Sequence, residues 1–167
     1  MPIKKHKEQH SAKYDVAIIG GGLAGLTLAC LLGKNGIHVA VIDAADPAKP
    51  MNADERTTAI SYGSSLILEE AGVWDALVSK GAPIRDIQIM DGDSPLLLNF
   101  LSEEVENKSF GTIVLNADIR AALAGKVAAL NNVTFIAPVK VSDFELNDNE
   151  QSVAVRLDNG ESVTASL

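Results

Sequence analysis

Residues 15–25 read Asp-Val-Ala-Ile-Ile-Gly-Gly-Gly-Leu-Ala-Gly, and this stretch decides the fold. A short β-branched run leads into glycines spaced Gly-x-Gly-x-x-Gly. Leu23 to Lys34 then has the composition of a helix that ends at Asn35-Gly36. Ile37 to Ile42 supplies a second strand. Two parallel strands joined by a helix form a right-handed βαβ unit, so we predict an α/β fold that begins with one.

The glycine spacing is typical of a Rossmann-like turn that binds a pyrophosphate. Gly20 permits the tight turn, and Gly22 lets the backbone approach the phosphates without a Cβ in the way. Gly25 lets the helix lie close to the sheet. The Gly-x-Gly-x-x-Gly string is weak evidence alone, but here it stands between a strand and a helix, as phosphate binding requires.

The start of the helix and the end of the second strand complete this prediction. Unpaired backbone amides at Leu23 and Ala24, at the positive helix end, are expected to face the phosphates. Asp43 follows Gly25 by 18 residues and ends the second strand, where a carboxylate accepts hydrogen bonds from a ribose diol. The alternative is a turn that merely packs, with Asp43 as a surface acid. FAD and NAD both contain ADP, so the fingerprint does not distinguish them.

The remaining segments extend this unit. We predict a flexible tail over residues 1–13 and one α/β unit over 14–167, in which residues 81–110 contribute to a partial second sheet. The expected helices cover residues 61–71, 73–79 and 117–130. The expected strands cover 84–90 and 96–101 as a hairpin, 112–115, 133–136 in the parallel sheet, and 139–146, 153–157 and 162–167 as an antiparallel meander.

Composition excludes several classes of protein. Acidic residues outnumber basic ones by 22 to 14, and the net charge of −8 argues against a nucleic-acid partner. The single cysteine, Cys30, is expected to pack in a helix face. His6 and His10 lack the ligands that usually accompany them, so no metal site is predicted. The amino-terminal end is not a secretory signal, and the apolar stretch 23–32 is about half of a membrane span. We expect a cytoplasmic protein.

A second set of residues carries a resemblance to a known family. It consists of Asp54-Glu55-Arg56-Thr57-Thr58-Ala59-Ile60-Ser61, then Leu66-x-x-x-Glu70-Ala71-Gly72-Val73-Trp74-x-x-Leu77, then Ala82-Pro83-Ile84-x-x-Ile87. These segments resemble the amino-terminal part of the ubiquinone-biosynthesis hydroxylases, which belong to the flavin-dependent aromatic monooxygenases similar to para-hydroxybenzoate hydroxylase. The resemblance covers residues 15–131 and implies FAD as the cofactor.

The resemblance also implies two further cofactor contacts. The family's arginine at the position of Arg56 lies against FAD, and the helix matching Asn116 to Arg120 borders the cofactor. A guanidinium at Arg56 would offset pyrophosphate charge and bind its oxygens. The alternatives are a solvated Arg56 paired with Asp54 or Glu55, and an exposed helical Arg120. No catalytic side chain can be named, because the cofactor performs the difficult step.

The resemblance implies an activity for a complete protein. NAD(P)H would reduce the flavin as a transient donor, and oxygen would then hydroxylate a small aromatic substrate. A polyprenyl phenol of ubiquinone biosynthesis is the implied substrate class. Such a lipid would bring the enzyme peripherally to a membrane, and a complex with other biosynthetic enzymes would be compatible with that location.

The family's later segments are missing from this sequence. Members continue with a Gly-Ala-Asp-Gly segment and a Gly-Asp segment, neither of which occurs here, so the chain resembles a truncated product and its FAD-binding domain is expected to be incomplete. We expect residues 1–167 alone to be inactive. Two alternatives stay open: a NAD-dependent dehydrogenase, and a non-catalytic dinucleotide-binding or interaction module.

Overall fold

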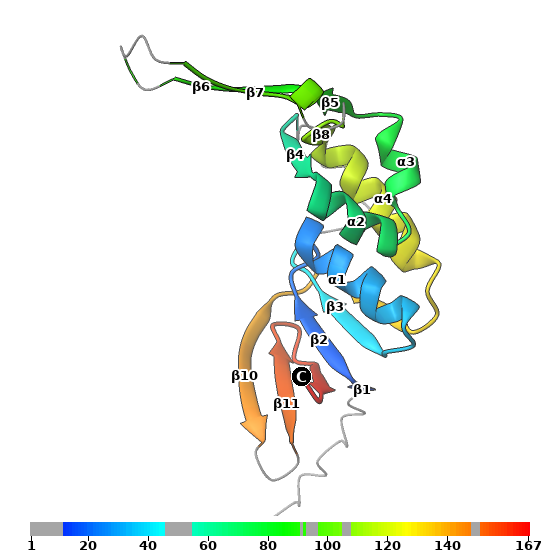
Figure 1. Ribbon diagram of the computed structural model, residues 1–167. Helices are drawn as coiled ribbons and strands as arrows, with labels where there is room; N and C mark the ends of the chain where they lie inside the picture. Colours follow the sequence, from blue (N-terminus) through cyan, green and yellow to red (C-terminus); the bar gives the residue numbers. More distant parts are fainter. Residues whose placement is uncertain (1–11, 46–54, 91, 93–96, 105–107, 148–150) are drawn as a thin grey trace, which may run out of the picture. The chain divides into compact units, whose positions relative to one another are not determined.

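The structure is a computed structural model that describes residues 12–45, 55–90, 92, 97–104, 108–147 and 151–167 (Figure 1). His6 and His10 lie outside the described residues. The chain divides into two compact units. The first contains residues 1–50 and 127–167, and the second contains residues 51–126.

The first unit is built on the predicted βαβ element. β2 (Val16–Ile19), α1 (Leu23–Lys34) and β3 (Val39–Ile42) follow one another, and β2 and β3 pair in parallel. β9 (Val133–Ile136) joins the other edge of β3, also in parallel, which gives the sheet order β2-β3-β9. The α/β fold and the predicted place of residues 133–136 in the parallel sheet are confirmed.

α1 packs on one face of this sheet because its apolar residues recur along one side. Leu26 is 2% exposed, and Ala29 and Cys30 are fully buried, as is Val41 of the strand beneath. Burial of Cys30 in a helix face agrees with the prediction. The far end of α1 is tied to the start of β9 by Asn132, whose Nδ2 donates to the carbonyl oxygens of Gly33 at 2.9 Å and Ile37 at 2.7 Å.

The other face of the parallel sheet is covered by a second sheet (Figure 1). β10 (Val141–Asn147), β11 (Ser152–Leu157) and β12 (Ser162–Ala165) form the predicted antiparallel meander. Between the two sheets lies a buried core of Ala40, Ile42, Val139, Val155, Leu157 and Val163.

The predicted extent of the tail, residues 1–13, is wrong at its end. β1 (Ala12–Tyr14) is a strand that pairs in parallel with β12, opposite residues 163–165. Three residues without apolar alternation carry no periodic signal. Their conformation is set by the backbone groups that the edge of β12 offers.

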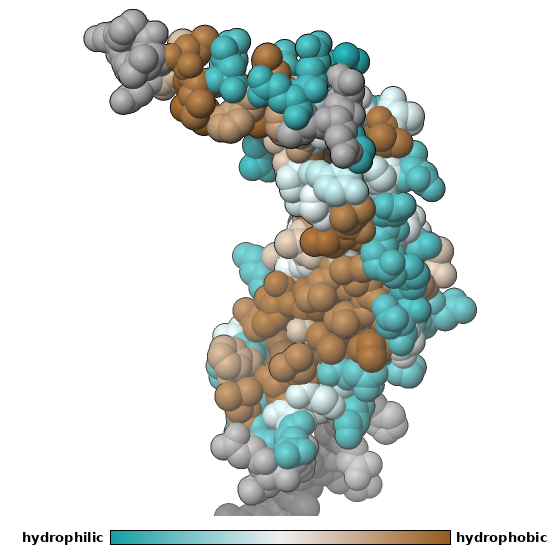
Figure 2. Space-filling view, in the orientation of Figure 1, coloured by the Kyte–Doolittle hydropathy of each residue, from teal (hydrophilic) through white to brown (hydrophobic). Residues whose placement is uncertain are grey.

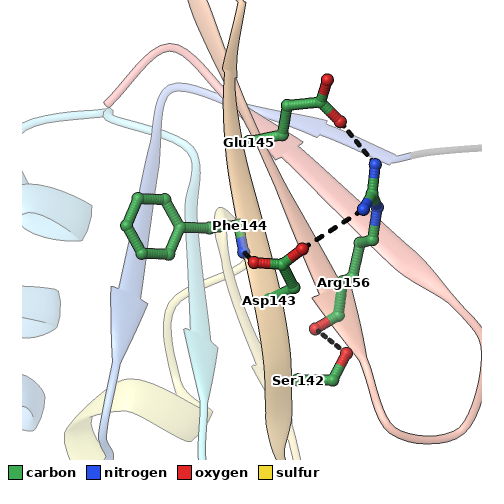
Figure 3. A network of polar contacts seen from close by, with 5 residues as sticks. All are labelled: Ser142, Asp143, Phe144, Glu145 and Arg156. Carbon is green, nitrogen blue, oxygen red and sulfur yellow. Dashed lines mark hydrogen bonds and ion pairs between the residues drawn. The ribbon is translucent and has the colours of Figure 1, made fainter.

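The meander separates charged and apolar side chains between its faces, because successive strand residues point to opposite sides. On one face, Arg156 of β11 reaches Asp143 at 3.3 Å and also Glu145, both on β10 (Figure 3). These side chains are 53–63% exposed, so the pairs contribute little to stability. Phe144 lies between the two acids in sequence and points away from them.

The second unit contains an antiparallel sheet of order β4-β8-β5. β4 (Thr57–Ser61) and β5 (Ala82–Ile84) both pair with β8 (Gly111–Leu115). The strand β4 is not among the predicted elements, and the strand predicted over 84–90 is two strands. It divides because β5 pairs with β8, whereas β6 (Asp86–Met90) pairs with another partner.

The second unit also contains three helices, whose bounds are close to the predicted ones. They are α2 (Tyr62–Glu70), α3 (Trp74–Val78) and α4 (Asn116–Ala128). Ser61 begins α2 as its N-cap, since its Oγ accepts a hydrogen bond from the Ser64 amide at 3.2 Å.

The predicted hairpin is present as a separate two-stranded sheet. β7 (Leu97–Leu101) pairs antiparallel with β6, and Ile87 stands opposite Phe100. A short 3-10 turn, η1 (Ser102–Glu104), follows, and the Ser102 amide donates to the Arg85 carbonyl at 3.0 Å. All residues of β6 and β7 are exposed. The partial second sheet expected from the sequence is therefore observed.

Candidate nucleotide-binding site

The glycine turn lies where β2 ends and α1 begins, as the sequence predicts. Gly20 has φ of +109°, a conformation that side chains disfavour, and its amide donates to the Ile42 carbonyl at 2.7 Å. The turn is thereby fixed to the end of β3, which leads into Asp43.

Gly25 allows a close approach between α1 and the turn. A Cβ at Gly25 would lie 2.0 Å from the Gly20 carbonyl oxygen and 3.3 Å from Cγ2 of Ile18. No side chain fits there without moving the backbone. Gly22 differs, because a Cβ on it would meet no atom of the described residues within 4 Å. The space beside Gly22 is open, as the approach of a ligand to this backbone requires.

The first turn of α1 offers amides without competing side chains. Gly22 is the N-cap, has no side-chain cap, and its carbonyl accepts the first helical hydrogen bond from Leu26 at 2.9 Å. The N–H groups at a helix start, here those of Leu23, Ala24 and Gly25, have no partner within the helix. No acidic side chain lies in this turn. The helix end therefore suits an anion.

Asp43 faces the turn. Its Oδ2 accepts the Gly21 amide at 2.5 Å, and its Oδ1 accepts the Ala45 amide at 2.6 Å. Each carboxylate oxygen can accept two hydrogen bonds, so each could accept a ribose hydroxyl besides the amide that it already binds. The Asp43 backbone is held from both sides, by Ile136 at 3.1 Å and Val139 at 2.9 Å. Sequence spacing finds Asp43 but gives no indication of the Gly21 contact.

The structure brings Gly20, Gly22, Leu23, Ala24, Gly25 and Asp43 together in the first unit. Arg56 and Arg120 belong to the second unit, where Arg56 is exposed before β4 and Arg120 is half-buried in α4. Their contact with a cofactor stays a prediction.

The two segments that carry these arginines meet within the second unit. The Asn116 amide donates to the Arg56 carbonyl at 3.0 Å, and the Thr58 hydroxyl donates to Oδ1 of Asn116 at 2.6 Å. The start of α4 is therefore joined to the strand that follows Arg56. Asp54, considered as a partner of Arg56, lies outside the described residues.

A hollow of about 670 Å³ opens elsewhere on the first unit. Ile19, Phe144, Leu146 and Leu167 contribute to its lining and are 59–79% exposed, and Figure 2 shows apolar side chains gathered over this region. Ile19 and its neighbour Ile18 point to opposite faces of β2, and Ile18 faces α1. Among the residues that the structure describes, none with a charged side chain lines this hollow, so these lining residues do not suit a diphosphate.

Metal-ligand clusters and membrane-spanning helices are both absent from the described part of the chain. In those ranges, no three residues of His, Cys, Asp or Glu gather as metal ligands would. No helix there is long and apolar enough to cross a membrane.

Comparison with known sequences points to flavoproteins. Residues 13–162 match a family described as "FAD binding domain". A ubiquinone hydroxylase, UbiL, of Rhodospirillum rubrum is 37% identical over 155 residues, which are 92% of this chain and 35% of the relative. The 3-demethoxyubiquinol 3-hydroxylase of Escherichia coli is 32% identical over 158 residues, with 92% and 39% covered. The chain thus spans about a third of the length of these relatives.

Solved structures share the fold. A probable FAD-dependent monooxygenase, pqsL, of Pseudomonas aeruginosa superposes with a TM-score of 0.73 at 21% identity, over 92% of this chain and 41% of that protein. The p-nitrophenol 4-monooxygenase PnpA of Pseudomonas putida gives 0.71 at 19% identity, over 92% and 39%. At such identities the likeness concerns the fold alone.

Proposed function

This chain belongs to the FAD-binding-domain family, and on that premise we propose that it holds the ADP half of FAD in an FAD-dependent aromatic-ring hydroxylase. One observation carries the proposal: the Asp43 carboxylate is hydrogen-bonded to the glycine turn beside the uncapped start of α1. A diphosphate and its ribose need an anion site and a hydroxyl acceptor at such adjoining positions.

The residues of the site divide this task. The amides of Leu23, Ala24 and Gly25 would receive the phosphate oxygens, and the bare backbone at Gly22 would let them approach. Asp43 would accept the ribose hydroxyls. FAD, when bound, supplies the electron transfer and the oxygen chemistry. The chain orients it, with Arg56 and Arg120 as the proposed additional contacts.

We propose a polyprenyl phenol as the small aromatic substrate and NAD(P)H as the transient electron donor. Relatives named as ubiquinone hydroxylases support the substrate class, and the donor is what the family resemblance implies. We propose a cytoplasmic location with peripheral membrane contact through the lipid substrate, and association with other enzymes of the same biosynthesis. Residues 1–167 alone are expected not to hydroxylate it, because they contribute only the nucleotide side of the site.

The binding proposal is tested by titrating the purified chain with FAD and with ADP, following flavin fluorescence and heat of binding. Asp43→Ala is expected to weaken both ligands about ten- to a hundredfold, since a hydrogen bond to a charged group contributes about 1.5–3 kcal/mol. Glu69→Ala, which removes an equal charge from an exposed position of α2, is the matched control and should leave affinity unchanged. No binding by the wild type would refute the proposal.

The two alternatives predict different results in the same assays. A NAD-dependent dehydrogenase would bind NAD in preference to FAD. A non-catalytic module would bind FAD but show no NAD(P)H oxidation with phenols, even when joined to the downstream two-thirds of a relative. Steady hydroxylation by residues 1–167 alone would contradict the expected inactivity of this portion.

A further inference from the structure

Gly21, the middle glycine of the turn, must be glycine for a reason that the Gly-x-Gly-x-x-Gly pattern does not show. The pattern leaves this position free, yet Gly21 is buried, and it is not among the glycines with positive φ. A Cβ there would lie 2.7 Å from Cε2 and 2.8 Å from Cζ of Phe135, and 2.8 Å from Oδ2 of Asp43. The need for glycine is therefore one of space, and the ring of Phe135 takes that space.

Phe135 lies on β9, which is at the opposite edge of the parallel sheet from β2, the strand that leads into the glycine turn. It lies on β9 opposite Val41 of β3, and its ring is half-buried. Val133, two residues earlier on the same face, meets the other end of α1: its Cγ2 would lie 2.5 Å from a Cβ on Gly33. β9 thus approaches a glycine at each end of α1, but only the Phe135 contact lies beside Asp43.

We infer that Phe135 is a positioning residue for the cofactor, which holds the Gly21 peptide against the Asp43 carboxylate and so sets the place of the ribose acceptor relative to the phosphate-binding amides. This inference rests on the proposed function. Gly21 donates to Oδ2, the oxygen that a side chain at position 21 would displace. The Phe135 ring and Oδ2 of Asp43 both lie beside the same point on Gly21, because an added Cβ there would be 2.7 Å from the ring and 2.8 Å from the oxygen. A packed ring at this point would hold the Gly21 amide toward the carboxylate before a ligand arrives.

Size exchange between positions 21 and 135 tests this inference. Gly21→Ala is expected to weaken FAD and ADP at least about tenfold, because the added methyl must displace the ring or the carboxylate. Phe135→Leu removes both ring atoms that the methyl would meet. The double variant, Gly21→Ala with Phe135→Leu, is expected to bind within about threefold of Phe135→Leu alone. If the two substitutions acted independently, Gly21→Ala would weaken binding equally in both backgrounds.

Gly33→Ala is the matched control, because it creates an equally close contact with Val133 away from Asp43. It is expected to lower the melting temperature while leaving the FAD affinity of the folded protein unchanged. If Gly21→Ala does not fold, the comparison of Phe135→Leu with the double variant still decides the matter. A double variant more than about tenfold weaker than Phe135→Leu would then overturn the inference.

The outcomes separate this inference from the function on which it rests. A wild-type chain that binds neither FAD nor ADP refutes both. A wild-type chain that binds, with Gly21→Ala binding equally well or with no recovery in the double variant, overturns the role of Phe135 alone. Recovery of affinity in the double variant, with Gly33→Ala unaffected in binding, supports it.

Discussion

Gly25→Ala tests whether α1 must approach the turn as closely as the structure shows. The new Cβ would stand 2.0 Å from the Gly20 oxygen, so the helix must retreat by about 1.4 Å to reach ordinary contact at 3.4 Å. Overpacking costs about 1–3 kcal/mol, and a collision with backbone belongs near the upper end. Alanine is about 1 kcal/mol more favourable than glycine in a helix, so the free energy of unfolding should fall by about 2 kcal/mol in total.

The melting temperature, followed by circular dichroism, measures this loss. For a chain of this size 1 kcal/mol corresponds to about 2–4 °C, so Gly25→Ala should melt about 4–8 °C lower. Gly125→Ala is the control, because position 125 of α4 has open space and should melt about 2–4 °C higher through propensity alone. FAD affinity of Gly25→Ala should fall about ten- to a hundredfold as the amides shift. Equal or higher stability of Gly25→Ala would refute the close approach.

Other variants separate packing from binding. Leu26→Ala should lower the free energy of unfolding by about 2–5 kcal/mol, since Leu26 is 2% exposed, whereas Leu28→Ala at 45% exposure should change it by less than about 0.5 kcal/mol in chemical denaturation. Gly22→Ser should leave the melting temperature unchanged or higher, because serine is a good N-cap, yet weaken FAD by filling the open space; unchanged affinity would contradict a ligand there. The His38 amide donates to the Asp15 carboxylate at 2.8 Å and holds its pKa below the usual 3.8. This contribution to stability is present above pH 3.8 and is lost as the pH falls through the lower folded-state pKa. Asp15→Asn should therefore melt below the wild type near neutral pH, and melting curves in strong acid should show the gap closing; a gap that persists there would contradict this origin.

The sequence located elements well wherever a periodic pattern and a turn signal coincide. The helix over residues 23–34 and the strand over 133–136 have the bounds expected from their apolar runs. The sequence did not predict strands that form only by pairing with the edge of a strand far away in the chain. β1 and β4 are examples, because their residues carry no alternation of their own, and their pairing with β12 and β8 supplies the hydrogen bonds.

The site shows the same division. The spacing of the glycines between a strand and a helix predicted Gly20, Gly22, Gly25 and Asp43 as binding residues, since a strand, a turn and a helix in that order leave few positions for a phosphate and a sugar. The structure places these four residues close together. The spacing said nothing of position 21, which the motif leaves free.

Sequence by itself therefore determined the βαβ unit with its glycine turn and membership of the FAD-binding-domain family. Only the tertiary structure decided how the site is held, through the Gly21 contact with Asp43 and the ring of Phe135. The physical reason is the range of the forces. Turn conformation and helix start follow from neighbouring residues, whereas close contact between residues about a hundred positions apart exists only after the sheet has brought β9 beside β3.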